Sequence, residues 1–249
     1  MLKVLTQDII GKPKAVIFDT DNTLYPYEMS HSAAMDAVKK KSKSVLGVTE
    51  KEFENAFKVA RKEIKLQLGE TASSHSRLLY FQKTIESLAL RTRILITLDL
   101  EQTYWRTYLT NTKLFSYVRE FILELKSNGI LMANITDLTA QIQFRKMVYF
   151  GLDEHFDYVV TSEEAGHDKP DPRPFQIALD KLKIDPEETW MIGDSASADM
   201  AGANLFGIKK IQKIHKNVVI GQGDAKPDIV FSEYASLSNY LKKIVNSNN

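Results

Sequence analysis

The chain contains no cysteine among its 249 residues. This absence excludes disulfide bonds and thiolate metal sites. Histidine is also scarce, and the spacing of the five histidines is not typical of metal ligands: His31, His75, His155, His167 and His215. Any metal in this protein would therefore be held by oxygen ligands, which favour a hard cation.

Long apolar runs and an excess of one charge are absent as well. No apolar stretch approaches the roughly 20 residues needed to span a bilayer, and MLKVLTQDIIGKPK lacks the apolar core of a signal peptide. Lys and Arg number 33 against 32 Asp and Glu, a net charge of +1 that favours neither nucleic acid nor a membrane surface as partner. We expect a soluble cytoplasmic protein, a monomer or homodimer.

The chain shows two different patterns of apolar residues. Short apolar runs alternate with helical patterns in residues 1–27 and 111–249, whereas residues 28–110 show helical spacing throughout. The alternation predicts an α/β core domain with a parallel sheet covered by helices on both faces. We expect strands at residues 14–18, 130–135, 156–160, 190–192, 208–211 and 229–231.

The segment 28–110 predicts about four helices and no strand. Phe53, Phe57 and Ile64 recur at the spacing of one helical face. Thr49 followed by Glu52 has the pattern of a capping box at a helix start. The chain is therefore expected to fold as a discontinuous core with a helical domain inserted in it.

Polar side chains follow the predicted strands where each strand ends. The first strand is followed by Asp19, Asp21 and Thr23, and the next by Thr136 and Asp137. Lys169 precedes Pro170, and Asp194 and Asp199 follow a later strand. Carboxylates that lie together repel one another unless a cation lies between them. Magnesium accepts such ligands, and with a lysine and a hydroxyl it makes a site for a phosphoryl group.

Alone, each of these features has an ordinary explanation. Asp19 and Asp21 could form a solvated turn, Asp194 or Thr136 could cap a helix, and Lys169 could lie in a surface loop. Four features in this order resemble the haloacid dehalogenase-like hydrolase superfamily over the whole core: FDTDNTL, ANITDL, GHDKPDP and GDSASAD. The helical insert looks like the cap of its phosphatase branch, on a Rossmann-like core.

The resemblance implies a magnesium-dependent phosphatase that acts on a small phosphorylated metabolite, a sugar phosphate or a nucleotide. In that family's mechanism Asp19 would attack phosphorus and form an aspartyl-phosphate. Asp21 would protonate the leaving group and then activate water. Thr136 would hold the phosphoryl group, and Lys169 would neutralise its charge.

The resemblance also implies that magnesium is bound by Asp19, the Asp21 carbonyl and Asp194. Thr23 and Asp199 would not bind the metal but would hold its ligands in position. Asp137 departs from the Asn that often follows the second motif, and it would lie beside the substrate with no assigned role. His75 and Arg77 lie at a break in the helical segment and are further candidates for substrate contact.

Three alternatives to a phosphatase remain open in the sequence. A phosphomutase of the same superfamily would use the same residues. A haloacid dehalogenase would need neither magnesium nor an acid at the position of Asp21. The presence of Asp21 and of the intact metal-binding acids therefore argues against a dehalogenase. A catalytically silent binding protein on this fold is disfavoured because Asp19, Asp21 and Asp194 are all present.

Overall fold

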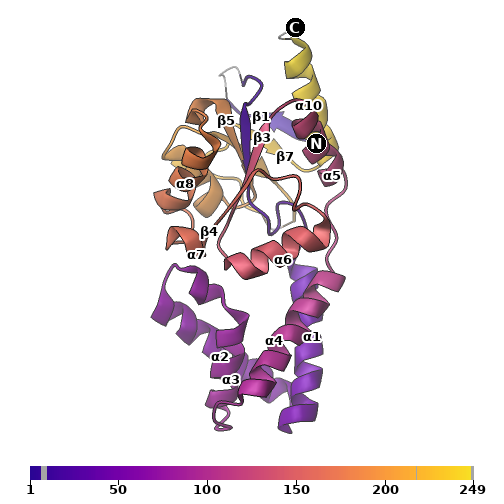
Figure 1. Cartoon of the computed structure of the whole chain (residues 1–249), viewed down its shortest axis with the longest axis vertical. Coiled ribbons are helices and arrows are strands. Elements are labelled where there is room, and N and C mark those ends of the chain that lie inside the picture. The colour runs from indigo at the N-terminus through magenta and orange to yellow at the C-terminus, as the bar shows by residue number, and fades with distance from the viewer. Residues whose placement is uncertain (7–9, 217, 248–249) are drawn as a thin grey trace. The chain divides into compact units, whose positions relative to one another are not determined.

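A computed structural model describes residues 1–6, 10–216 and 218–247 (Figure 1). The chain forms two compact units. One comprises Met1–Tyr25 and Lys113–Asn249, and it is called the core unit below. The other comprises Pro26–Thr112 and is called the helical unit. No helix in the described ranges is long and apolar enough to cross a membrane.

The core unit contains a seven-stranded sheet in the order β1-β7-β6-β5-β2-β3-β4. Its strands are β1 (Leu2–Val4), β2 (Ala15–Phe18), β3 (Leu131–Thr136), β4 (Tyr158–Thr161), β5 (Thr189–Gly193), β6 (Lys209–Lys213) and β7 (Ile229–Phe231). All neighbours are parallel except β1, which pairs antiparallel with β7. The sheet, expected to be parallel, is therefore mixed at one edge. The edge strand β1 was not predicted, because its three residues are too few to show a periodic pattern.

Helices cover both faces of this sheet, as predicted. In Figure 1, α8 lies on one side of the strands, and α5 and α10 lie on the other. The helical elements of the core unit are α5 (Val118–Ser127), α6 (Ala140–Phe150), α7 (Ser162–Ala165), α8 (Pro172–Leu182), η2 (Pro186–Glu188), η3 (Ala196–Met200), α9 (Ala201–Asn204), η4 (Gly223–Ala225) and α10 (Tyr234–Ser247). We did not predict α10, although Tyr234, Leu237 and Leu241 form a buried face at helical spacing.

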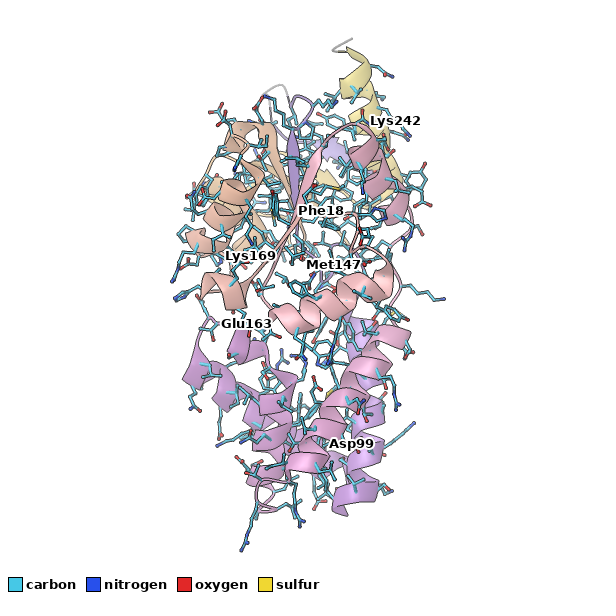
Figure 2. All side chains as sticks on the ribbon, viewed as in Figure 1. Phe18, Asp99, Met147, Glu163, Lys169 and Lys242 are labelled. Atoms are coloured by element: carbon cyan, nitrogen blue, oxygen red, sulfur yellow. The ribbon has the colours of Figure 1, made fainter. Side chains whose placement is uncertain are left out.

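The central strand β2 is buried on both faces. Ala15 and Ile17 belong to the apolar cluster that includes Phe175 of α8. Phe18, which is labelled in Figure 2, points to the other face, because side chains alternate along a strand. Its ring packs edge-on against Phe121 and Phe156. β2 is thus packed between two apolar layers. This packing fixes the position of Asp19, the residue that follows the strand.

The helical unit consists of α1 (Tyr27–Leu46), α2 (Glu50–Leu68), η1 (Ala72–His75), α3 (Arg77–Ser87) and α4 (Ile94–Thr110). Its four α-helices agree with the number expected. The capping box is present: the Thr49 hydroxyl accepts from the Glu52 amide, and the Thr49 amide donates to the Glu52 carboxylate. Phe53, Phe57 and Ile64 form the buried face of α2.

Candidate active site

Three adjacent strands deliver polar residues to one rim of the sheet. In the order β5-β2-β3, the residues at or just after the strand ends are Asp194, Asp19 and Thr136. The strands are parallel, so their carboxyl ends meet at the same edge, where ligands bind in open α/β sheets. Asp19 and Thr136 are both buried. The structure thus brings together residues separated by more than 100 positions in the sequence.

Both oxygens of the Asp19 carboxylate accept hydrogen bonds. Lys169 Nζ donates to Asp19 Oδ1 over 2.7 Å, and Thr23 Oγ1 donates to Oδ2 over 2.9 Å. The Asp19 amide donates to the carbonyl of Ile192 over 2.9 Å, which continues the β2–β5 ladder. These bonds fix the orientation of the Asp19 carboxylate, whose side chain is 12% exposed.

Lys169 links two carboxylates. Its ammonium group also donates to Asp199 Oδ1 over 2.7 Å, and the residue is 6% exposed. Burial opposes the charge of Lys169, but the carboxylates of Asp19 and Asp199 hold its pKa well above the usual value. Lys169 is therefore a fixed positive charge beside Asp19.

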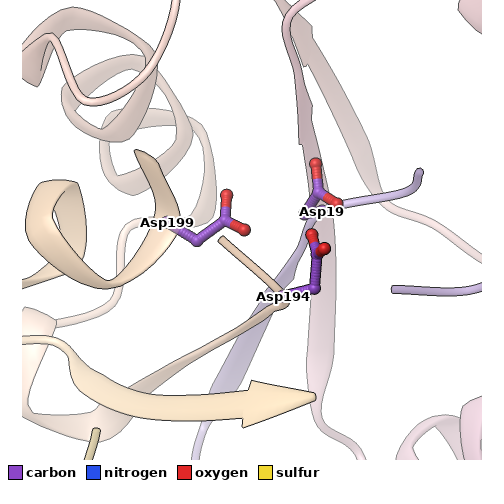
Figure 3. Close-up of side chains that lie close together, drawn as sticks. All are labelled: Asp19, Asp194 and Asp199. Carbon is purple, nitrogen blue, oxygen red and sulfur yellow. The ribbon is translucent and has the colours of Figure 1, made fainter. Parts of the chain in front are cut away.

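Asp194 and Asp199 complete an acidic cluster with Asp19. One carboxylate oxygen from each lies within 4.8 Å of the others, and Figure 3 shows the three side chains together. Burial and the charges of Asp19 and Asp199 raise the pKa of Asp194 to about 8. Burial also raises the pKa of Asp199 to about 7, although Lys169 opposes the shift. The positive charge of Lys169 therefore compensates only part of the negative charge that the three carboxylates would carry when ionised.

Asp199 reaches the cluster because of the backbone on either side of it. It lies in η3, a π-helical turn, and its Oδ2 accepts a hydrogen bond from the Ser195 amide over 3.0 Å. Its carboxylate packs against Gly193, where a Cβ atom would lie 2.3 Å from Asp199 Oδ2. A glycine is thus required at the end of β5 for this close approach.

The cluster fits a magnesium ion by the chemistry of its donors. Two carboxylates without a nitrogen or sulfur donor suit a hard cation, and Asp199 is already held by Lys169 and by the Ser195 amide. Asp19 and Asp194 are therefore the side chains that could hold a metal. The Asp21 side chain is outside this cluster.

Asp137 lies directly after Thr136, and its carboxylate is turned toward the loop that carries Lys169. Asp137 Oδ1 accepts from the Lys169 amide over 2.9 Å and from Ser162 Oγ over 3.3 Å. Burial raises the pKa of Asp137. These bonds place Asp137 where it orients the Lys169 backbone.

Sequence reasoning missed Lys146. This lysine of α6 is 1% exposed, and its Nζ donates to both carboxylate oxygens of Asp21 over 2.8 and 3.1 Å. The ammonium group also lies 5.5 Å from the ring centre of Tyr25. A signal was available, because Lys146 falls on the apolar face of α6 that includes Ile142 and Met147.

A second buried lysine lies at the end of β6 and was also missed. Lys213 is 2% exposed and lies 4.3 Å from the ring centre of Phe115. Burial lowers the pKa of Lys213, and the charge of Asp194 opposes this shift. His215 follows, with Nε2 at 3.6 Å from Asp194 Oδ2. Basic groups therefore lie near Asp194 as well as beside Asp19 and Asp199.

Comparison with known proteins identifies the class of protein. A model of the haloacid dehalogenase-like hydrolase family matches residues 13–207. The chain therefore belongs to the haloacid dehalogenase-like hydrolases, as its motifs predicted.

Individual relatives narrow the activity. The chain is 36% identical to a ribulose-1,5-bisphosphate 5-phosphatase of Halopiger xanaduensis over 79% of this chain and 83% of that protein. It is 28% identical to a glyceraldehyde 3-phosphate phosphatase of Methanopyrus kandleri over 80% and 83% of the two chains. Together with the family, these relatives show a hydrolase of phosphoric monoesters.

Solved structures show the same fold. A phosphatase of this family from Thermococcus onnurineus superimposes with a TM-score of 0.69 over 92% of this chain and 97% of that one, at 23% identity. The hydrolase YfnB of Bacillus subtilis gives a TM-score of 0.70 over 93% and 99%, at 18% identity.

Proposed function

We propose that this protein is a magnesium-dependent phosphatase that hydrolyses a small phosphorylated metabolite through an aspartyl-phosphate on Asp19. The observation that carries the proposal is the placement of Lys169. It lies between Asp19 and Asp199, with Asp194 in the same cluster, so one carboxylate is held rigidly beside both a fixed cation and a candidate metal site. This arrangement suits electrostatic stabilisation of a phosphoryl group in transfer.

The roles of the residues follow from their contacts. Asp19 Oδ1 is bonded to Lys169 and Oδ2 to Thr23, which orients the carboxylate as the nucleophile toward phosphorus. Thr136, at the end of the neighbouring strand, would bind the phosphoryl oxygens. Magnesium held by Asp19, Asp194 and the Asp21 carbonyl would supply positive charge to the phosphoryl group. Asp199 and Asp137 hold Lys169 in position.

Asp21 is proposed as the acid and base, and Lys146 bears directly on that role. A bidentate ammonium contact stabilises the ionised carboxylate, which is the form needed to take a proton from the attacking water. To protonate the leaving group first, Asp21 must gain a proton and turn away from Lys146. Lys146 is thus proposed to set the balance between the two forms.

The substrate is proposed to be a phosphorylated sugar or a related small metabolite. The two relatives described above are named for ribulose-1,5-bisphosphate and glyceraldehyde 3-phosphate. We further propose that residues 28–110, with His75 and Arg77, act as the cap that selects among such compounds.

The test is phosphate release from a panel of sugar phosphates, nucleotides and p-nitrophenyl phosphate, with magnesium and again with EDTA. Asp19→Asn, which keeps the shape of the side chain, is expected to abolish release and to leave the fold intact by circular dichroism. Release by Asp19→Asn at the wild-type rate would refute the mechanism. Stimulation by a sugar bisphosphate with no net release would favour a phosphomutase, and no turnover at all a silent binding protein.

A further inference from the structure

The C-terminal helix α10 contacts the turn that follows the proposed nucleophile. Tyr234 is the first residue of α10, is 1% exposed, and donates from its hydroxyl to the Thr23 carbonyl over 3.0 Å. Both residues belong to the core unit. The family model ends at residue 207, so this contact comes from a part of the chain that the model does not match. Tyr234 therefore adds to the surroundings of Asp19 a residue that the family motifs do not contain.

The Thr23 carbonyl depends on this one donor. Thr23 is 0% exposed, and among the described residues only the Tyr234 hydroxyl donates to its carbonyl. The next carbonyl, that of Leu24, is held differently, by the Phe115 amide over 2.9 Å. A buried carbonyl without a donor is costly, so the main chain shifts or finds another partner when the donor is removed. The Tyr234 hydroxyl therefore fixes the backbone at Thr23.

The turn between β2 and Leu24 is tight. The amides of Thr23 and Leu24 both donate to the Thr20 carbonyl, over 3.2 and 2.8 Å. Asn22 adopts the left-handed conformation, with a φ of 63°. The Leu24 amide and the Thr23 carbonyl are the two ends of one peptide group. That peptide group is therefore fixed from two directions, by the turn itself and by α10.

The Thr23 side chain transmits this placement to Asp19. Its Oγ1 donates to Asp19 Oδ2 over 2.9 Å, whereas Lys169 Nζ donates to Oδ1 over 2.7 Å. Threonine is β-branched and has few allowed χ1 rotamers, so its hydroxyl moves with its main chain. One of the two side-chain bonds that orient the Asp19 carboxylate therefore depends on the position of the Thr23 peptide group.

Tyr234 is itself held firmly. Its ring packs against Phe121 with ring centres 5.6 Å apart and against Phe231 with ring centres 5.1 Å apart. Burial raises the pKa of Tyr234 well above its usual value, and the charges of Asp19 and Asp194 raise it further. Tyr234 is thus a neutral donor, which holds a carbonyl near the acidic cluster without adding charge to it.

We propose that Tyr234 is a positioning residue for the phosphatase reaction: its hydroxyl fixes the Thr23 peptide group and thereby keeps the Thr23 hydroxyl bonded to Asp19. The inference rests on the proposed function and extends the active site to the C-terminal helix. Tyr234 acts only through Thr23 and contacts neither the phosphoryl group nor the metal. Nucleophilic attack requires an aligned carboxylate, so a misplaced Asp19 slows the chemical step more than it weakens substrate binding.

The first test is Tyr234→Phe, which removes one hydroxyl and keeps the packed ring. With magnesium and p-nitrophenyl phosphate, we expect kcat to fall about tenfold and KM to change less than about twofold. The control is Ser238→Ala in the same helix. Ser238 is buried and its hydroxyl donates to Glu124 Oε2 of α5, so this variant also loses a buried hydroxyl bond of α10. Wild-type kcat in Tyr234→Phe, or an equal fall in Ser238→Ala, would overturn the inference.

A double-mutant cycle tests whether the effect passes through Thr23. Thr23→Val replaces the hydroxyl that binds Asp19 with a methyl group. If Tyr234 acts only through that hydroxyl, Tyr234→Phe should change kcat less than about twofold in the Thr23→Val background. A second fall of about tenfold in that background would show that Tyr234 acts by another route, and it would overturn the inference.

Crystal structures separate this inference from the proposed function, because they need no turnover. In Tyr234→Phe we expect a displaced Thr23 peptide group and a Thr23 hydroxyl beyond hydrogen-bond distance of Asp19. In Ser238→Ala the Tyr234–Thr23 and Thr23–Asp19 bonds should both remain. This result would support the positioning role even if wild-type protein hydrolysed nothing. A Thr23–Asp19 bond that is unchanged in Tyr234→Phe would overturn the inference, and the wild-type assay alone would then decide the proposed function.

Discussion

At Asp19, hydrogen bonds distinguish the proposed nucleophile from the other carboxylates beside it. Lys169 and Thr23 occupy its two oxygens, whereas Asp199 is taken up by Lys169 and the Ser195 amide. Among the residues that the structure describes, no such pair of donors reaches Asp194, and burial raises its pKa to about 8. Equivalent side chains thus receive different chemical roles from their partners.

Lys146→Met tests the control of Asp21 at the same scale. Loss of the ammonium group removes the charge that stabilises ionised Asp21, so the acidic limb of the kcat profile should move up by about 1–3 pH units. Methionine matches the buried stem of the lysine. The measurement is the pH dependence of kcat with p-nitrophenyl phosphate, because its good leaving group needs no proton from Asp21 and the base role then governs the acidic limb.

Lys146→Arg is the control, since it keeps the positive charge and should leave the acidic limb near its wild-type position. Identical profiles for wild type and Lys146→Met would show that Lys146 has only a structural role. A lower rate with an unshifted limb would lead to the same conclusion.

At the scale of the element, local sequence explains several helix ends well. Thr49 and Glu52 were expected to cap α2, and both reciprocal bonds are present. By contrast, α10 begins at Tyr234, whose hydroxyl donates to the Thr23 carbonyl over 3.0 Å. That bond joins residues 211 positions apart, so the sequence around Tyr234 does not predict it.

Thr49→Ala is expected to destabilise α2 by about 1 kcal/mol, because it leaves a helix-terminal amide without its acceptor. Hydrogen exchange of the α2 amides, followed by mass spectrometry, measures the change directly.

Thr110→Ala is the matched control for the cap. Thr110 is exposed, and its hydroxyl donates only to carbonyls of its own helix, at Arg106 and Thr107. We expect its effect to stay within about 0.5 kcal/mol. A Thr49→Ala effect as small as that of the control would mean that the capping box adds nothing.

At the scale of the whole molecule, the acidic cluster couples stability to pH and to metal. In metal-free protein the pKa of Asp194 rises from 3.8 to about 8 on folding. Folded protein then binds more protons than unfolded protein between these values. The stability contributed by protonated Asp194 is complete below about pH 3.8 and is lost as the pH rises through about 8.

The proposed magnesium ion would bind the ionised form, so its stabilising effect should grow with pH. The measurement is the difference in Tm between magnesium and EDTA at pH 5, 6, 7 and 8. We expect this difference to increase steadily in wild type and to be nearly absent in Asp194→Asn. A difference that is independent of pH, or one retained in Asp194→Asn, would argue against Asp194 as a ligand.

Local sequence was enough to predict the class of fold and the polar residues at the rim of the sheet. Apolar runs that end in Asp19, Thr136 and Asp194 predict strands and strand ends, because hydrophobic periodicity and turn chemistry are local properties. The helical insert was predicted for the same reason.

The contacts of Lys146, Lys213 and Arg77 could not be predicted from local sequence. Each is buried and meets a partner from another segment: Lys146 meets Asp21, Lys213 meets Phe115, and Arg77 meets Tyr27. The antiparallel pairing of β1 with β7 is likewise set across the length of the chain. Sequence periodicity describes which face of an element is buried, whereas electrostatic partners depend on which elements pack together, and that information is non-local.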